Sequence, residues 1–445
     1  MSARRRARDA ARVVRAHGVP DWWLDAKLGI FIHWTPASVP GFAPTGQEIA
    51  ELLASGDPTA LAHSPYSEWY ENSLRFADSP VSRHHASTYG TRPYREFARE
   101  WEAALESWNP DDWARRFAAT GARYVVLVTK HHDGYCLWPT SVPNPHEPRW
   151  HCERDVVGEL AEAVRAAGMR FGVYYSGGID SRWNDHPIGA FSDLPLAVPR
   201  GAYPDYARAQ VEELVQRYRP SVLWNDICWP APAAHLAPIL AEYYATAPDG
   251  VVNDRFLCWS PAWVLARTTV VRRTIDRAVS NAARKERGII PPKPRFYDVR
   301  TPEYTVFDDV QRTPWECVRG MDNSFGYNRA STEEDFIARD DLLWSLVDIV
   351  AKGGNLLLNV GPRGEDAQIP DVQQRRLDWL TEFTSAHGHA LFGTRPWSRA
   401  ADAAGDTEVR YTSRGNDVFA FTHGDADRLT DVLPESVREA IPVIP

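Results

Sequence analysis

The chain has 445 residues, of which 44% are hydrophobic and 24% charged, and its formal net charge is −9. These values are typical of a globular protein, and the negative charge gives no support to a nucleic-acid partner. The 5 cysteines are odd in number and scattered without a C-x-x-C pair, which indicates reduced thiols rather than a disulfide framework or a zinc site.

The amino-terminal residues 1–8 are basic, but neither an apolar segment nor a small-residue cleavage site follows them. A secretory signal is therefore not expected. The chain has no run of 18 apolar residues, so we expect no membrane-spanning helix. These observations favour a cytoplasmic protein.

Short apolar runs alternate with helix-like segments along most of the chain. Strands are predicted at residues 27–33, 123–134, 170–176, 221–227, 250–255 and 353–362. Helices are predicted at residues 111–118, 155–167, 206–218, 236–247, 331–352 and 369–387. Acidic first turns and terminal glycines support several of these helices. The alternation predicts a parallel α/β sheet.

Two segments between the predicted strands are unusually long. Residues 35–110 are irregular and rich in proline, glycine and aromatic clusters, and such a connection usually carries function. Residues 267–295 contain nine lysines and arginines against Asp276 and Glu286. Two interpretations of this basic segment stay open: a solvated helix followed by a proline-rich loop, or a mobile lid or docking patch for an acidic partner.

The pattern changes near the carboxyl terminus. Residues 407–422 alternate between apolar and polar positions around a turn at 414–417, which predicts a β-hairpin. We therefore expect two domains, a large α/β domain at residues 1–392 and a small β domain at residues 393–445.

Polar and aromatic residues stand where the predicted strands stop. In a parallel barrel the carboxyl ends of the strands meet at one rim, where active sites are built. Such residues are His33, His131, His132, Tyr174, Asp226, Asp254 and Arg255, joined by Glu68 and Trp69 from the long loop and by Glu303. Carboxylates, imidazoles and aromatic rings together suit a sugar-binding site, although the 18 Trp and 17 Tyr also fit an aromatic-rich core.

Two carboxylates could catalyse glycoside hydrolysis at this rim. Asp226 ends a buried strand, where donors could keep it ionised beneath an anomeric carbon. Glu303 follows on a loop, where burial could keep it protonated beside a leaving oxygen. The 59 carboxylates of the chain leave this pairing a hypothesis.

The histidines allow a second interpretation, a metal site formed by His33, His131 and His132. Adjacent histidines on a strand point to opposite faces, and no H-x-H or H-E-x-x-H spacing occurs. Donation to substrate hydroxyls is therefore favoured over metal binding. The Gly177–Gly178 and Gly353–Gly354 pairs lack phosphate-loop spacing, and no G-x-S-x-G motif offers a nucleophilic serine.

Ten short motifs, in order along the chain, resemble those of the glycoside hydrolase family 29 α-L-fucosidases. The motifs lie at residues 27–34, 68–70, 130–134, 172–176, 223–226, 252–255, 301–304, 315–316, 324–327 and 353–359. The similarity spans roughly residues 20 to 397. An ordered set of ten motifs is far more specific than any one of them.

The resemblance implies an irregular (β/α)8-like barrel followed by a small β-sandwich-like domain, and a retaining, exo-acting mechanism with no metal or organic cofactor. It implies that Asp226 is the nucleophile and that Glu303 is the general acid and base. The residues implied in binding fucose are His33, Glu68, Trp69, His131, His132, Tyr174, Trp224, Arg255 and Phe325.

Two departures from the family pattern leave alternatives open. The basic segment 267–295 lengthens the connection from Arg255 to Glu303, so Glu316 is the fallback acid. The chain after residue 397 matches weakly, which predicts an abbreviated β domain. A fucose-binding protein without catalysis, a hydrolase of related sugars such as α-L-galactosides, and a metal-dependent hydrolase are the competing functions. Aglycone contacts are expected from loops, and the basic segment is one candidate.

Overall fold

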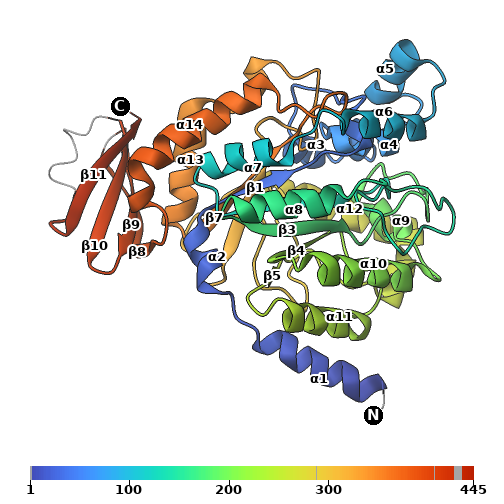
Figure 1. Cartoon of the computed structure of the whole chain (residues 1–445), viewed down its shortest axis with the longest axis horizontal. Helices are drawn as coiled ribbons and strands as arrows, with labels where there is room; N and C mark the ends of the chain where they lie inside the picture. Colours follow the sequence, from blue (N-terminus) through green and yellow to red (C-terminus); the bar gives the residue numbers. More distant parts are fainter. Residues whose placement is uncertain (1–2, 287, 405, 425–432, 445) are drawn as a thin grey trace.

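The computed structural model describes residues 3–286, 288–404, 406–424 and 433–444. Arg287, one of the nine basic residues counted in segment 267–295, lies outside the described residues. The chain forms a seven-stranded sheet and a separate four-stranded sheet near the carboxyl terminus (Figure 1). Within the described part, no helix combines the length and apolarity that crossing a membrane requires.

The larger sheet is parallel throughout, with strand order β5-β4-β3-β2-β1-β7-β6. Every residue of β1, β2, β4 and β7 is buried, which explains why these strands are apolar runs without alternation. The strands are β1 (Leu28–Ile32), β2 (Tyr124–Lys130), β3 (Arg170–Ser176), β4 (Val222–Asp226), β5 (Val251–Val252), β6 (Trp315–Arg319) and β7 (Gly354–Val360).

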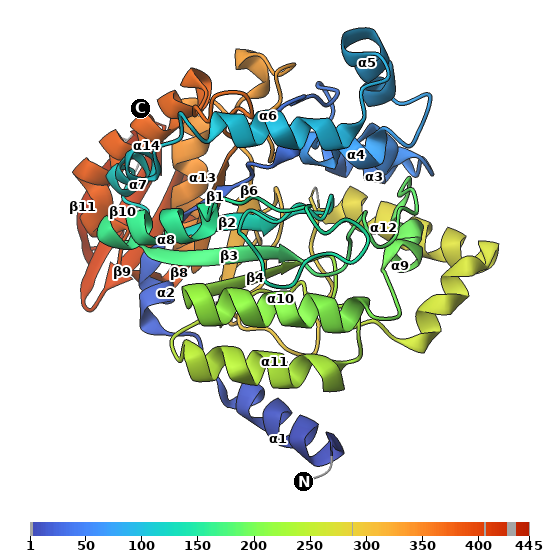
Figure 2. The same cartoon turned by 45° about the vertical axis from the view of Figure 1, so that its right-hand side comes forward.

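Helices connect the strands and cover the outside of the curled sheet (Figure 2). The connecting and covering helices are α7 (Pro110–Ala119), α8 (Val156–Ala166), α10 (Tyr203–Tyr218), α11 (Ala233–Thr246), α13 (Arg339–Ala351) and α14 (Asp371–His387). Side chains cap the first turns of α7 and α8. Asn109 accepts the Asp112 N–H at 3.1 Å, and Asp155 accepts the Gly158 N–H at 2.9 Å.

Single-residue bridges join the two edges of the sheet. Asn253, just after β5, pairs with Val299, while Arg300 and Glu303 pair with Trp315 and Val318 of β6. Residues 299–303 therefore occupy the place of an eighth strand. The predicted irregular (β/α)8-like barrel is confirmed as a curled seven-stranded sheet completed by this short segment. The same bridges place Glu303 at the rim.

The predicted irregular loop at residues 35–110 is instead largely helical. Its buried positions recur at helical spacing in short pieces, for example Phe97, Ala98 and Trp101, between the prolines and glycines that dominate the composition. Short pieces of this kind are easily missed in sequence. The helices are α3 (Ile49–Ser55), α4 (Tyr70–Ser73), α5 (Pro80–Tyr89) and α6 (Phe97–Ala104).

The predicted helix start at residue 331 is also wrong. Thr332 and Asp335 form the expected capping interaction, with the Thr332 N–H donating to Asp335 Oδ2 at 2.7 Å, but it closes only one 3₁₀ turn. Phe336 is then extended and buries its ring, and α13 begins at Arg339.

The amino-terminal helices pack against the barrel. Helix α1 (Ala3–Ala16) lies along α11 (Figure 2), and α2 (Asp21–Ala26) carries the buried Trp23. The main-chain carbonyl of Trp23 accepts the side-chain amide of Asn355 in β7 at 2.9 Å.

The carboxyl-terminal sheet has strand order β11-β10-β9-β8, and the predicted hairpin is its β9–β10 pair. One face packs on the helices of the barrel, where Phe421 contacts Phe383 of α14 (Figure 1). The small β domain is thus present, while the exact division at residue 392 stays a prediction. The strands are β8 (Arg395–Ala404), β9 (Thr407–Arg414), β10 (Asp417–His423) and β11 (Val437–Ile444).

Candidate active site

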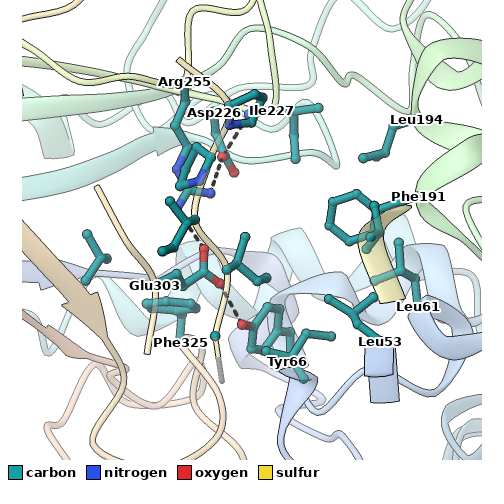
Figure 3. Close-up of a pocket in the computed structure, with 18 of the residues that line it drawn as sticks. Leu53, Leu61, Tyr66, Phe191, Leu194, Asp226, Ile227, Arg255, Glu303 and Phe325 are labelled. Atoms are coloured by element: carbon teal, nitrogen blue, oxygen red, sulfur yellow. Dashed lines mark hydrogen bonds and ion pairs between the residues drawn. The ribbon is translucent and has the colours of Figure 1, made fainter. Parts of the chain in front are cut away.

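A cavity of about 420 Å³ opens at the carboxyl ends of the barrel strands (Figure 3). Its size is typical of a small-molecule site. Of the eleven site residues predicted from sequence, all but His132 line it, and His132 lies directly behind with its Nε2 3.6 Å from Asp226 Oδ2. The structure therefore brings together residues that are up to about 290 positions apart in sequence.

Asp226 is the last residue of β4 and faces the cavity. Tyr174 of β3 donates its hydroxyl to Asp226 Oδ2 at 2.8 Å, and the Ile227 N–H donates to Oδ1 at 2.8 Å. Ile227 has φ of 66°, a conformation that is rare for a β-branched residue. This sharp turn aims its N–H at the preceding carboxylate and so fixes the carboxylate relative to the barrel.

Glu303 faces the same cavity from the segment that completes the barrel. Tyr66 donates its hydroxyl to Glu303 Oε1 at 2.6 Å, and Arg255 donates to Oε2 at 2.8 Å. A second nitrogen of the same guanidinium lies 3.5 Å from Asp226 Oδ1. Arg255 thus bridges the two carboxylates, as the dashed lines in Figure 3 show.

Aromatic rings form the floor of the cavity beneath this carboxylate pair. Trp224 stacks on Tyr174 with 5.4 Å between ring centroids, and the Arg255 guanidinium lies 5.0 Å above the Trp224 ring. The ring centroids of Phe325 and His33 are 5.1 Å apart. These apolar faces suit the C–H faces and methyl group of a deoxy sugar.

The three histidines are buried and neutral at physiological pH. Burial lowers the pKa of His33 and of His132 to about 3 and that of His131 well below its usual range. Asn359 fixes His33 through Nδ1 at 2.6 Å, and Ser176 fixes His132 through Nδ1 at 2.7 Å.

Near Asp226, two buried imidazole nitrogens have no protein hydrogen-bond partner. They are Nδ1 of His131, which lines the cavity, and Nε2 of His132, which lies behind the wall 3.6 Å from Asp226 Oδ2. Buried polar atoms are nearly always satisfied, so unpaired ones in a cavity wall indicate a ligand with hydroxyl groups. Among the described histidines, cysteines and carboxylates, no group of three is arranged to hold a metal ion.

Glu68 enters the cavity from the 3₁₀ turn η3 (Ser67–Trp69). Burial raises the pKa of Glu68 to about 8, although the Gly326 N–H donates to its Oε2 at 2.8 Å. At neutral pH the side chain is therefore a carboxylic acid that can both donate and accept. Trp69, next in sequence, packs edge-to-face against His132, with 4.9 Å between the ring centroids.

We expect Glu68→Gln to stabilise the protein increasingly as pH rises. The folded protein keeps a proton on Glu68 that the unfolded chain loses above pH 4.5, so the stability from this group is present below pH 4.5 and is lost as pH rises to about 8. Relative to Glu68→Gln, the unfolding free energy of the wild type should fall by roughly 1.4 kcal/mol per pH unit within that window. Urea unfolding at several pH values measures this slope, and parallel pH profiles of the two proteins would contradict the assignment.

Two other carboxylates that the sequence raised as candidates have supporting positions. Glu316 does not line the cavity: it accepts the Tyr124 hydroxyl at 2.7 Å and the Trp224 indole N–H at 3.1 Å, behind the aromatic floor. Asp254 is fully buried and accepts the N–H and hydroxyl of Thr301 at 3.0 and 2.6 Å. Glu303 is therefore better placed than the fallback Glu316, and Asp254 holds the segment that carries Glu303.

Sequence reasoning missed two residues that the structure places at the site. Tyr66 donates to Glu303, and Phe31 of β1 packs against Trp224 at 5.3 Å. The proximity of Tyr66 to Glu68 in the long loop was a usable signal. The sequence contains no signal for Phe31, because a phenylalanine inside a buried strand looks like any core residue.

Glycoside hydrolases work with two carboxylates that face one cavity, and this chain places such a pair at the carboxyl rim of a parallel barrel. The α-L-fucosidase family model matches residues 2–389, so the chain belongs to the α-L-fucosidase family.

Relatives and solved structures agree with this placement. An α-L-fucosidase of Branchiostoma floridae is 30% identical over 418 residues, covering 90% of this chain and 78% of that protein, and the tissue α-L-fucosidase of Bos taurus is 29% identical over 415 residues, covering 90% and 74%. The crystal structure of the Thermotoga maritima α-fucosidase is 41% identical, covers 92% of this chain and 84% of its own, and superposes with a TM-score of 0.75.

Proposed function

We propose that this protein is a retaining, exo-acting α-L-fucosidase that releases terminal α-L-fucose by double displacement, with Asp226 as nucleophile and Glu303 as general acid and base. The observation that carries the proposal is the Arg255 guanidinium, which bridges Asp226 and Glu303 across one cavity. Related Thermotoga maritima α-fucosidase structures, 40% identical to this chain, hold fucose and a mechanism-based inhibitor.

In the first step a carboxylate oxygen of Asp226 attacks the anomeric carbon from the β face. Glu303 gives its proton to the glycosidic oxygen, the bond to the leaving group breaks, and a β-fucosyl ester of Asp226 forms. Tyr174 and the Ile227 N–H hold the attacking carboxylate in place. The aromatic floor and neutral imidazoles position the sugar ring and its hydroxyls.

In the second step Glu303 takes a proton from water, which attacks the anomeric carbon from the opposite face. The ester bond breaks, α-L-fucose leaves, and the carboxylate of Asp226 is restored. Arg255 donates to Glu303 Oε2 at 2.8 Å and so holds this carboxyl group at the cavity.

The anomer that forms first tests this mechanism. Proton NMR of a fresh reaction with an aryl α-L-fucoside should show α-L-fucose before the β anomer grows in by mutarotation. Initial β-L-fucose would mean an inverting enzyme, and binding without hydrolysis would mean a fucose-binding protein. An aryl α-L-galactoside in parallel measures how far the site tolerates a hydroxyl on C6.

A further inference from the structure

The cavity extends well beyond the carboxylate pair, and its two ends differ in chemistry. The polar end contains the predicted site residues. The other side, which we call the aliphatic end, is built mainly from apolar side chains, among them Leu53, Leu61, Phe191 and Leu194 (Figure 3). Among the described residues lining the aliphatic end, Glu286 alone is ionisable, and it pairs with Lys285 at 3.2 Å.

The basic segment supplies one wall of the aliphatic end. Its helix α12 (Thr269–Glu286) turns Ile275, Val279 and Ala283 toward the cavity at helical spacing, while basic side chains such as Arg273 and Arg277 are exposed. The segment is thus an amphipathic helix whose apolar face belongs to the site.

Hydrogen bonds attach α12 to the neighbouring walls. Ser280 Oγ donates to the main-chain carbonyl of Ala54 in α3 at 3.0 Å. On the other side, Asp276 accepts the N–H and the hydroxyl of Ser192 at 3.0 and 2.8 Å, next to Phe191 in the 3₁₀ turn η5 (Phe191–Asp193). These hydrogen bonds hold the apolar face of α12 in place as one wall of the cavity.

The aliphatic end lies on the leaving-group side of the site. Ile289, which lines it, exchanges two main-chain hydrogen bonds with Glu303, at 3.0 and 2.8 Å. A general acid stands beside the leaving oxygen, so the group attached to that oxygen extends from Glu303 along Ile289 toward α12. This placement of the aglycone rests on the proposed function.

We infer that the aglycone this enzyme accepts best is an apolar alcohol rather than a second sugar. A sugar in this position would bury hydroxyl groups against side chains that offer them no partner. An alkyl or alicyclic group would instead remove apolar surface from water on both sides of the contact.

A series of n-alkyl α-L-fucosides from methyl to octyl tests the inference. The longer alcohols leave equally well, so chain length changes contact and not chemistry. The kcat/KM should rise roughly two- to fourfold per added methylene until the aliphatic end is filled, and octyl α-L-fucoside should exceed α-L-fucosyl-(1→2)-galactose at least tenfold. A flat series, or a preference for the disaccharide, overturns the inference.

Two substitutions on α12 form a matched pair. Val279→Asn places an amide in the aliphatic end, whereas Val270→Asn makes the same change at a position that is 76% exposed and outside the cavity. The octyl-to-methyl ratio of kcat/KM should fall at least fivefold in Val279→Asn and stay unchanged in Val270→Asn. The milder Val279→Thr serves if the asparagine variant unfolds, and equal ratios in all variants contradict the inference.

A binding measurement tests this inference separately from the proposed function. Calorimetry with Asp226→Ala, which needs no turnover, should show octyl α-L-fucoside binding at least tenfold more tightly than methyl α-L-fucoside. If the wild type hydrolyses no fucoside but this difference persists, the proposed function fails and the apolar subsite stands. If hydrolysis occurs and the two ligands bind equally, only the subsite fails.

Discussion

Replacing Asp226 with alanine should lower kcat/KM for an aryl α-L-fucoside at least ~10³-fold, because the covalent route contributes several kcal/mol to lowering the barrier. The Tyr174 hydroxyl and the Ile227 N–H hold this carboxylate in place, and the alanine variant removes it from the cavity. Steady-state kinetics of the purified variant measures the loss.

Added azide should restore turnover in Asp226→Ala and yield the β-configured fucosyl azide, since the anion fits the space that the carboxylate leaves. Asp226→Asn is the matched control: its amide oxygen can accept the Ile227 N–H and its NH2 group can donate to the Tyr174 hydroxyl, so it should fold equally well, yet it leaves no room for azide. Melting curves that match the wild type establish that both variants are folded. Near-normal activity in Asp226→Ala would remove Asp226 from the mechanism.

Replacing Glu303 with alanine should have an effect that depends on the leaving group. Loss of a general acid costs roughly 10²- to 10⁴-fold, and methyl α-L-fucoside, which needs the proton, should show the full loss. A dinitrophenyl α-L-fucoside needs no proton to depart, so its first step should be nearly preserved and a burst of dinitrophenol should precede slow turnover. Rapid-mixing kinetics resolves the two phases.

Azide also distinguishes the two roles by stereochemistry. In Glu303→Ala it should attack the fucosyl-enzyme from the open face and give the α-configured azide, the opposite anomer to that expected from Asp226→Ala. In Glu316→Gln the amide oxygen can still accept the Trp224 indole N–H and the NH2 group can donate to the Tyr124 hydroxyl, so the variant should lose less than tenfold activity and show no rescue. Rescue in a Glu316→Ala variant and none in Glu303→Ala would reverse the assignment.

The sequence predicted the strands that carry the site well, because a strand buried on both faces is a dense apolar run and its end is marked by the first polar residue. Asp226 and Tyr174 were found in this way. Short helices between residues 35 and 110 were missed because each is too brief to show a full period against its prolines and glycines. The residue pattern offered Glu303 only as a hypothesis among the 59 carboxylates, and the family resemblance implied its role as general acid and base.

Two features follow from the sequence alone: the parallel α/β architecture with its small β extension, and the set of residues available for sugar chemistry at strand ends. Localisation in the cytoplasm stays a prediction from sequence. Local patterning suffices for these features because periodicity and strand ends are properties of neighbouring residues.

Only the tertiary structure decided how the residues act together. It brought Arg255 between Asp226 and Glu303, moved Glu316 behind the aromatic floor, and turned the apolar face of α12 into a wall of the cavity. Each of these depends on contacts between segments far apart in the chain, which no local pattern encodes. The basic segment resembles solvated surface in sequence because charged residues dominate its composition. In the structure the apolar face of its helix α12 lines the cavity.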